Sequence, residues 1–190
     1  MRRVFVLWLM AWLTGCAAMP ERQCAKLHAE VMYCLQPVEA MGDVSALQQV
    51  DFKFPQHSNT VLVEFEMEGQ AFTIAVLTPM GHKLMQYKYM PSEIISLGGL
   101  LTKFDPVLLA ALVQLSVWPS QSVTNGLRGK FEWTATQDHR WLRTEGKTLV
   151  DIAMHGQQPV PDTLLIQLPL QHIELHIQTL QQTLHQTLPP

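Results

Sequence analysis

The stretch VLVEFEMEGQAFTIAV, residues 61–76, decides the fold. Apolar and polar side chains alternate in it, pause at a Gly-containing turn and alternate again. Successive side chains of a strand point to opposite faces, so residues 59–78 are predicted to form a β-hairpin with one buried face. The apolar positions of that face are Val61, Val63, Phe65, Met67, Phe72, Ile74 and Val76.

Further alternating segments flank an apolar middle. The additional strands are expected at 82–90, 130–136, 139–143, 147–154, 164–166 and 173–177. In the middle, Asp105-Pro106 suits a helix start, because Asp caps well and Pro fits the first helical position. Val107–Val117 is apolar on nearly all sides, which favours burial on more than one side, and Trp118-Pro119 ends it. The fold class is thus mainly β with helices (α+β), in which an antiparallel sheet wraps around the central helix.

Residues 1–15 have the features of a secretion signal. Arg2 and Arg3 precede an uncharged apolar run, Val4–Leu13, of about ten residues, whereas a spanning helix needs roughly 20. The following Leu13-Thr14-Gly15-Cys16 resembles the lipobox of bacterial lipoproteins. The resemblance implies cleavage before Cys16, a diacylglycerol on its thiol and a further acyl chain on the new amine.

Such an anchor fixes the expected location. More than one acyl chain gives stable anchoring, at about 0.8 kcal/mol per buried methylene. Residue 17 is Ala17 rather than the Asp that resembles an inner-membrane retention signal, so we expect the outer membrane, facing the periplasm. Without Arg2 and Arg3 the chain has 11 basic and 16 acidic residues, a formal charge of −5, which argues against a nucleic-acid partner.

The mature chain divides into three expected parts. Residues 16–45 are interpreted as the lipidated tether and an N-terminal helix, because Leu27, Val31 and Leu35 are spaced along one helical face. Residues 46–178 form the main domain, and 179–190 a C-terminal tail that is either a short amphipathic helix or a loose end.

Two cysteines remain in the mature chain, Cys24 and Cys34. The oxidising periplasm permits a disulfide between them, which we favour over two buried thiols. Their spacing matches neither a redox motif nor a zinc pattern.

Two stretches carry a resemblance to a known group. Leu77-Thr-Pro-Met-Gly81-His-Lys-Leu84, followed by Tyr87 and Tyr89, is similar to a motif of the LolA/LolB-like lipoproteins, and the Asp105 helix with its Trp118-Pro119 ending resembles their helical insert. More narrowly, residues 45–178 resemble small proteobacterial lipoproteins of unknown function, whose genes often lie beside those for aryl polyene synthesis.

This resemblance implies an antiparallel, incompletely closed β-barrel with a helical lid or plug over its concave side. It also implies a hollow that binds an apolar acyl-like or polyene-like ligand, with residues 105–118 as the lid. A barrel of this size can hold one small ligand, although the same side chains could simply fill a core. The expected ligand-facing residues are Phe65, Ile74, Val76, Leu84, Leu108, Leu112, Trp118, Trp133 and Trp141.

The functional hypothesis is therefore an outer-membrane lipoprotein that binds an apolar ligand and assists its transport or placement in the envelope. The alternative is a structural or assembly lipoprotein with a filled core that acts through envelope protein partners. No enzyme is expected, because the sequence has no Gly-x-Ser-x-Gly elbow and no phosphate-binding Gly loop. His172, Glu174 and His176 share one strand face, but their apolar neighbours take the inward face, so we predict neither a metal site nor a cofactor.

Cys16→Ser should remove the lipid and release the protein from the membrane. We expect metabolic labelling with an alkyne fatty acid to mark the native chain and not the variant, which moves to the soluble periplasmic fraction. Ala17→Asp should keep the label and shift the protein to inner-membrane fractions in a density gradient. A labelled Cys16→Ser chain would contradict the lipobox assignment.

Overall fold

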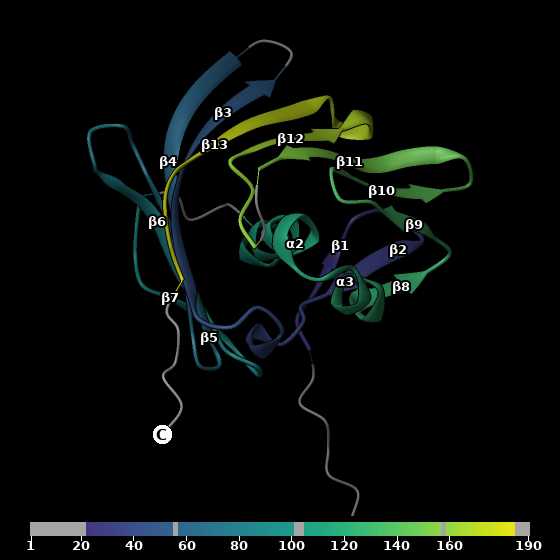
Figure 1. Ribbon diagram of the computed structural model, residues 1–190, viewed down its shortest axis with the longest axis horizontal. Helices are drawn as coiled ribbons and strands as arrows, with labels where there is room; N and C mark the ends of the chain where they lie inside the picture. Colours follow the sequence, from purple (N-terminus) through teal and green to yellow (C-terminus); the bar gives the residue numbers. More distant parts are fainter. Residues whose placement is uncertain (1–21, 55–56, 101–104, 157–158, 185–190) are drawn as a thin grey trace, which may run out of the picture.

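The computed structural model describes residues 22–54, 57–100, 105–156 and 159–184, and its main feature is a curved ten-stranded sheet (Figure 1). Its first five strands in chain order are β3 (Val44–Phe54), β4 (His57–Glu68), β5 (Ala71–Leu77), β6 (Lys83–Tyr89) and β7 (Ile94–Ser96). The other five are β9 (Glu132–Ala135), β10 (His139–Thr144), β11 (Lys147–His155), β12 (Thr163–Leu168) and β13 (Ile173–Leu184). The remaining elements are β1 (Cys24–Lys26), β2 (Val31–Cys34), η1 (Val38–Ala40), α2 (Pro106–Val117), α3 (Ser120–Gly126), β8 (Leu127–Gly129) and η2 (Pro169–Gln171).

β3 and β13, which come first and last along the chain among the strands of this sheet, pair with each other at its centre. The order is β7-β6-β5-β4-β3-β13-β12-β11-β10-β9, and every pairing is antiparallel. β13 pairs with β3 from Glu174 opposite Lys53 to Leu184 opposite Val44, which joins two meanders into one surface. Within the described residues the outer strands β7 and β9 do not pair with each other, so the sheet curls without closing (Figure 1). The predicted incompletely closed antiparallel barrel is confirmed.

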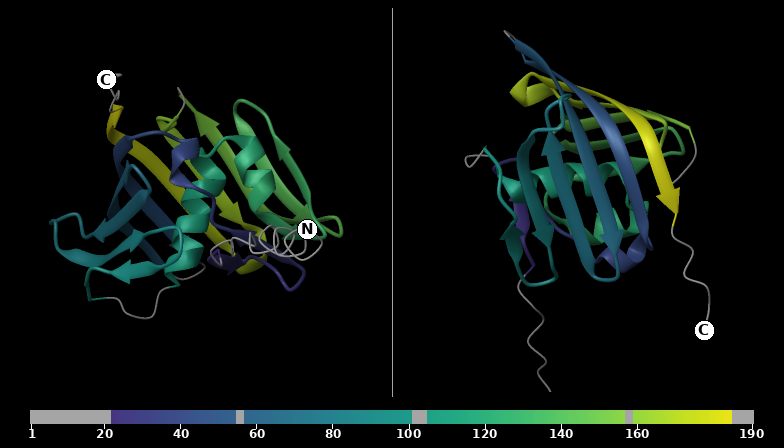
Figure 2. Two further views of the ribbon diagram at one scale, coloured as in Figure 1. Left: turned by 90° about the horizontal axis from the view of Figure 1, so that it is seen from below. Right: turned by 90° about the vertical axis from the view of Figure 1, so that its left-hand side faces the viewer.

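The central helix α2 lies on the concave side of this sheet, where Figures 1 and 2 show it surrounded by strands. Asp105 caps it as predicted, since its side chain accepts hydrogen bonds from the backbone N–H of Val107 at 2.9 Å and of Leu108 at 3.3 Å. The helix ends before Trp118-Pro119, as expected. Among the described segments, no helix is both long and apolar enough to cross a membrane.

A buried arginine holds the end of α2. Arg140 of β10 is 6% exposed, and its Nη1 donates to the carbonyl oxygens of Leu115 at 3.0 Å and Trp118 at 2.7 Å. Burial lowers the pKa of the guanidinium, while Tyr33 acts in the opposite direction. Arginine stays protonated in proteins, so it can satisfy two carbonyls that the helix end leaves without intrahelical partners.

The predicted N-terminal helix is wrong. The segment forms a hairpin, β1 and β2, that joins β8 in a small antiparallel sheet. Val31 and Tyr33 are fully buried while Met32 between them is 42% exposed, which is the period of a strand. Cys24 and Cys34 lie opposite each other and form a disulfide. The helical spacing of apolar residues in this segment was coincidental.

Both predicted boundaries of the main domain, at residues 46 and 178, also fall inside strands. Residues 44 and 45, assigned to the N-terminal part, are the first residues of β3, and the predicted tail from 179 continues β13 as far as Leu184. The backbone pairing of these two strands holds both segments in the sheet, although neither has a clear alternation of its own. Residues 1–21, including Cys16 and Ala17, lie outside the described part of the chain.

Arg140→Met should destabilise the fold through the end of α2. It leaves two buried carbonyl oxygens without a donor, and each such group costs about 1–3 kcal/mol. We expect urea unfolding followed by tryptophan fluorescence to give a free energy of unfolding lower by about 2–4 kcal/mol. The matched control is Arg143→Met on the exposed side of the same strand, with a change within about 0.5 kcal/mol. Equal losses in both variants would contradict the assigned role of Arg140.

Candidate functional site: two cavities beside the central helix

An apolar cavity of about 90 Å³ lies between α2 and the concave face of the sheet. Six strands supply its walls because alternate side chains of each strand point toward the helix. The apolar lining residues are Val50, Phe52, Val63, Val76, Met85, Leu109, Leu112, Val113, Val117, Leu164, Ile166, Leu175 and Ile177. We call this space the sheet cavity.

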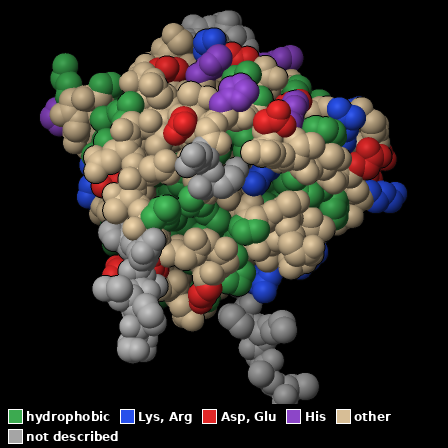
Figure 3. Space-filling model, in the orientation of Figure 1, with side chains coloured by type: hydrophobic (Ala, Val, Ile, Leu, Met, Phe, Trp, Pro, Cys, Tyr) green, Lys and Arg blue, Asp and Glu red, His purple; other side chains and the backbone are tan. Residues whose placement is uncertain are grey.

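The two polar side chains that line the sheet cavity are already hydrogen-bonded. Gln48 donates through Nε2 to Thr179 Oγ1 at 3.1 Å, and Ser116 Oγ donates to the carbonyl oxygen of Leu112 at 2.7 Å. With these groups used internally, the walls suit an occupant that makes apolar contacts. Leu109 and Val113 of α2 are half-buried, which places the entrance beside this helix. Figure 3, drawn in the orientation of Figure 1, shows hydrophobic side chains at the surface in the middle of the molecule.

Two of the nine residues predicted to face a ligand, Val76 and Leu112, line the sheet cavity. Phe65, Ile74 and Trp118 are instead packed into the core at 1%, 0% and 0% exposure. The Trp118 indole N–H donates to the carbonyl oxygen of Pro37 at 3.1 Å. These three large side chains fill the interior, which is the alternative that the sequence left open.

Leu84 and Leu108 lie next to lining residues without lining the cavity themselves. Val76 pairs with Met85 and Leu77 with Lys83, so Leu84 falls at an irregularity of the β5–β6 pairing and Met85 takes the inward position. On α2, Leu109 lines the cavity in place of the half-buried Leu108. A shift of one residue was enough to misplace both predictions.

The two remaining tryptophans serve other contacts. Trp133 is half-buried, and its indole N–H donates to Ser120 Oγ of α3 at 3.0 Å. Trp141 points to the outer face, opposite to the buried Arg140 and Leu142, with the His139 ring 5.0 Å from its centroid. The structure therefore does not place Trp141 on the concave face, because the inward register of this strand is taken by Arg140, a buried arginine that hydrophobic patterning could not identify.

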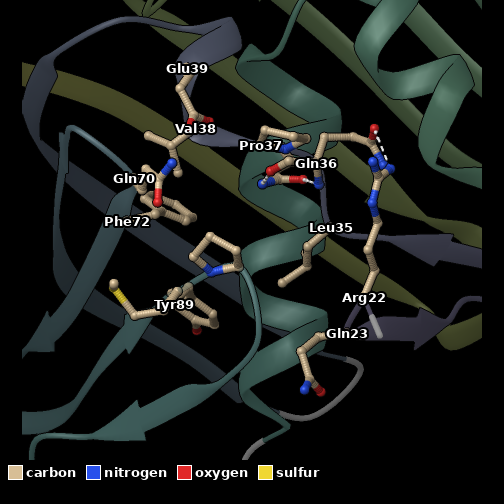
Figure 4. Close-up of a pocket in the computed structure, with 13 residues that line it drawn as sticks. Arg22, Gln23, Leu35, Gln36, Pro37, Val38, Glu39, Gln70, Phe72 and Tyr89 are labelled. Atoms are coloured by element: carbon tan, nitrogen blue, oxygen red, sulfur yellow. Dashed lines mark hydrogen bonds between the residues drawn. The ribbon is translucent and has the colours of Figure 1, made fainter. Parts of the chain in front are cut away.

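A second cavity, of about 310 Å³, has Gln114 of α2 in its wall. Figure 4 shows other residues that line it, among them Gln36 and Tyr89. We call it the polar cavity. Its walls come from the N-terminal segment, the β4–β5 turn and the end of β6. Its lining residues are Arg22, Gln23, Leu35, Gln36, Pro37, Val38, Glu39, Gln70, Phe72, Tyr89, Met90, Pro91 and Gln114. Sequence patterning did not indicate this cavity, because seven of its thirteen lining residues lie within 16–45, which was interpreted as a tether and a helix.

Glutamine amides organise the polar cavity. Gln114 Oε1 accepts from the Gln36 backbone N–H at 2.7 Å and from the Tyr33 hydroxyl at 3.0 Å, and its Nε2 donates to the Gln36 carbonyl oxygen at 3.0 Å. Arg22 Nη1 donates to Gln36 Oε1 at 3.2 Å. Burial raises the pKa of the Tyr33 phenol, which therefore stays a neutral donor. The same holds for Tyr89, whose hydroxyl donates to the Pro106 carbonyl oxygen at 2.8 Å.

His172, Glu174 and His176, which the sequence places on one strand face, have different surroundings in the structure. His172 follows η2 in a left-handed conformation, whereas Glu174 contacts His176 at 2.6 Å and Lys53 at 3.1 Å. Within the described chain, no three His, Cys, Asp or Glu side chains gather as metal ligands do. A hydrogen bond from Gln167, followed by those of His176 and Lys53, lowers the pKa of the Glu174 carboxyl to about 2.

A family model described as a protein of unknown function, DUF3261, matches residues 45–181. No curated protein matches the chain. A similar solved structure is a LolA superfamily protein from Nitrosomonas europaea, with a TM-score of 0.40, 9% identity and coverage of 80% of this chain and 91% of that one. Another is a domain assigned as an outer membrane lipoprotein-sorting protein from Vibrio parahaemolyticus, with a TM-score of 0.36, 11% identity and coverage of 78% and 87%.

Gln167→Leu should raise the pKa of Glu174 toward the ordinary value of about 4.3, because it removes the largest stabilising hydrogen bond. The folded-state pKa lies below the unfolded value, so this carboxylate stabilises the fold above about pH 4.3 and the contribution is lost as pH falls toward 2. Carboxyl ¹³C chemical shifts measured between pH 1.5 and 7 test this. Gln49→Leu, which removes a contact to Asp51 instead, should leave the titration of Glu174 unchanged.

Proposed function

Since the chain belongs to the DUF3261 family of proteins of unknown function, we propose from its own geometry that it binds an apolar, lipid-like chain beneath α2. The observation that supports this most is the sheet cavity, whose walls are apolar and whose two polar side chains are internally satisfied. Each methylene that leaves water contributes about 0.8 kcal/mol, so a short alkyl segment supplies a useful affinity. Acyl chains and polyenes share this chemistry. No covalent step is needed, and the protein acts as a binding protein rather than an enzyme.

Ligand entry requires one half of α2 to move. Its C-terminal half is held by five hydrogen bonds. Three join Gln114 to Tyr33 and Gln36 of the N-terminal segment, and two join Arg140 of β10 to carbonyl oxygens at the helix end. Its first turn is attached by the Asp105 cap and by the Tyr89 hydroxyl on Pro106 O, and its apolar side chains are only half-buried. The lid in this proposal is therefore the N-terminal half of α2, a shorter segment than the predicted 105–118.

Membrane attachment through Cys16 complements this role. Arg22 lines the polar cavity, and the six residue-to-residue steps between Cys16 and Arg22 span at most about 20 Å when extended. An acylated Cys16 in the outer membrane would keep this end of the molecule close to the lipid surface from the periplasmic side. A carrier held there could exchange an apolar chain with the membrane and assist its transport or placement in the envelope.

The second candidate is a structural or assembly lipoprotein that acts through protein partners. The small volume of the sheet cavity favours this candidate, because about 90 Å³ is less than the roughly 300–1,000 Å³ of ordinary ligand pockets. In this case the sheet cavity is a packing defect and α2 is a permanent plug. The two candidates differ in whether α2 moves to admit a ligand.

The test is to purify the Cys16→Ser form after export to the periplasm, extract it with organic solvent and identify bound lipids by mass spectrometry. A titration with N-phenyl-1-naphthylamine measures apolar binding directly. We expect about one equivalent of ligand or probe per chain. Val113→Phe, which fills the sheet cavity from the entrance, should weaken probe binding at least tenfold.

The control is Leu170→Phe, which adds an aromatic side chain at an exposed position of η2 that lines neither cavity. It should change the affinity less than twofold. A folded native protein that carries no lipid and shows no saturable probe binding would exclude the carrier role and favour the structural one.

A further inference from the structure

β13, the last strand in the described part of the chain, is paired on both sides for only half of its length. β12 pairs with β13 from Ile173 to Gln178, and the Thr179 N–H still donates to the Asp162 carbonyl oxygen at 2.8 Å. Beyond this point β13 continues to Leu184 along β3, and in the described part of the chain no strand pairs with its other side. The right-hand view of Figure 2 shows this half of the strand running on beside β3 with its far side open. We call residues 180–184 the free edge.

The free edge carries only one of the usual protections against pairing. Natural sheet edges use charges, prolines, short strands or bulges to prevent association with other chains. A bulge lies at Leu180, where the register of β13 on β3 shifts between Thr179 and Gln181, and residues 181–184 beyond it pair regularly with β3. The segment Leu-Gln-Gln-Thr-Leu has neither a charge nor a proline, and Leu180 and Leu184 are 49% and 56% exposed. The outer strands of the main sheet differ, because β7 has three residues and β9 has four, including Glu132.

We propose that the free edge pairs antiparallel with the free edge of a second copy of this chain. A two-fold axis places each segment opposite itself, so the strand must be compatible with its own sequence. Here no like charges meet, and the backbone N–H and C=O groups of alternate residues gain partners. The pairing also covers the two exposed leucines. Without Arg2 and Arg3 the chain has a formal charge of −5, which disfavours most other contacts between two copies, whereas this segment carries no charge.

This inference is independent of the proposed function. The residues of β13 that line the sheet cavity, Leu175 and Ile177, lie in its first half, and the polar cavity contains no residue of β13. Two copies joined in this way keep both cavities. A failure of lipid binding would leave the dimer intact, and a monomeric protein could still bind lipid.

The experiment is sedimentation velocity on the Cys16→Ser chain between 5 and 500 µM. A single strand pair makes a small interface, so we expect reversible dimers with a micromolar dissociation constant. Leu180→Lys combined with Gln182→Lys places like charges across the two-fold axis and should weaken association at least tenfold. Both positions are exposed, so far-UV circular dichroism and thermal unfolding should stay unchanged.

The matched control is Leu170→Lys with Gln171→Lys, which adds the same charge at exposed positions of η2 and should leave the dissociation constant within threefold. Hydrogen exchange on the native sequence provides a measurement that needs no variant. Amide protection at residues 180–184 should rise with protein concentration. A native chain that stays monomeric at 500 µM, or a dimer that persists in the Leu180/Gln182 variant, would overturn the proposal.

Discussion

The side-chain amide of Gln114 is the interaction on which the rest of this structure depends. It is 2% exposed in a helix that is otherwise almost entirely apolar, and it joins the Tyr33 hydroxyl and both backbone polar groups of Gln36. A buried polar group without a partner costs about 1–3 kcal/mol, so the helix has one favourable position. Apolar side chains alone would let it slide or rotate over the concave face.

This fixed position of α2 divides the interior. On one side of the helix, side chains at Leu109, Leu112 and Val113 leave the apolar sheet cavity, and on the other Gln114 borders the polar cavity. Arg140 of β10 reinforces the arrangement by donating hydrogen bonds to the carbonyl oxygens of Leu115 and Trp118 at the end of the helix. The molecule is consequently most firmly held around the C-terminal half of α2 and more loosely around its first turn. Ligand entry is proposed where the attachments are fewest.

Sequence patterning located the strands well and the site only in part. Alternation identified the 59–78 hairpin and the burial of Phe65 and Ile74, because a strand with one buried face has an unambiguous period. It could not separate residues that line a cavity from residues that fill a core, since both are apolar and inward. Trp141 shows the limit most clearly. Its neighbour Arg140 is the inward residue, and a buried arginine reverses the side that hydrophobicity suggests.

The sequence by itself determined the antiparallel character of the sheet, the capped helix that begins at Pro106 and the end of that helix before Pro119, because these follow from local periodicity and capping. Only the tertiary structure decided that residues 24–34 form a disulfide-linked hairpin, that β13 joins β3 and that the two cavities lie on opposite sides of α2. Each of these depends on contacts between segments far apart in the chain. Local side-chain patterns carry no information about which distant partner completes them.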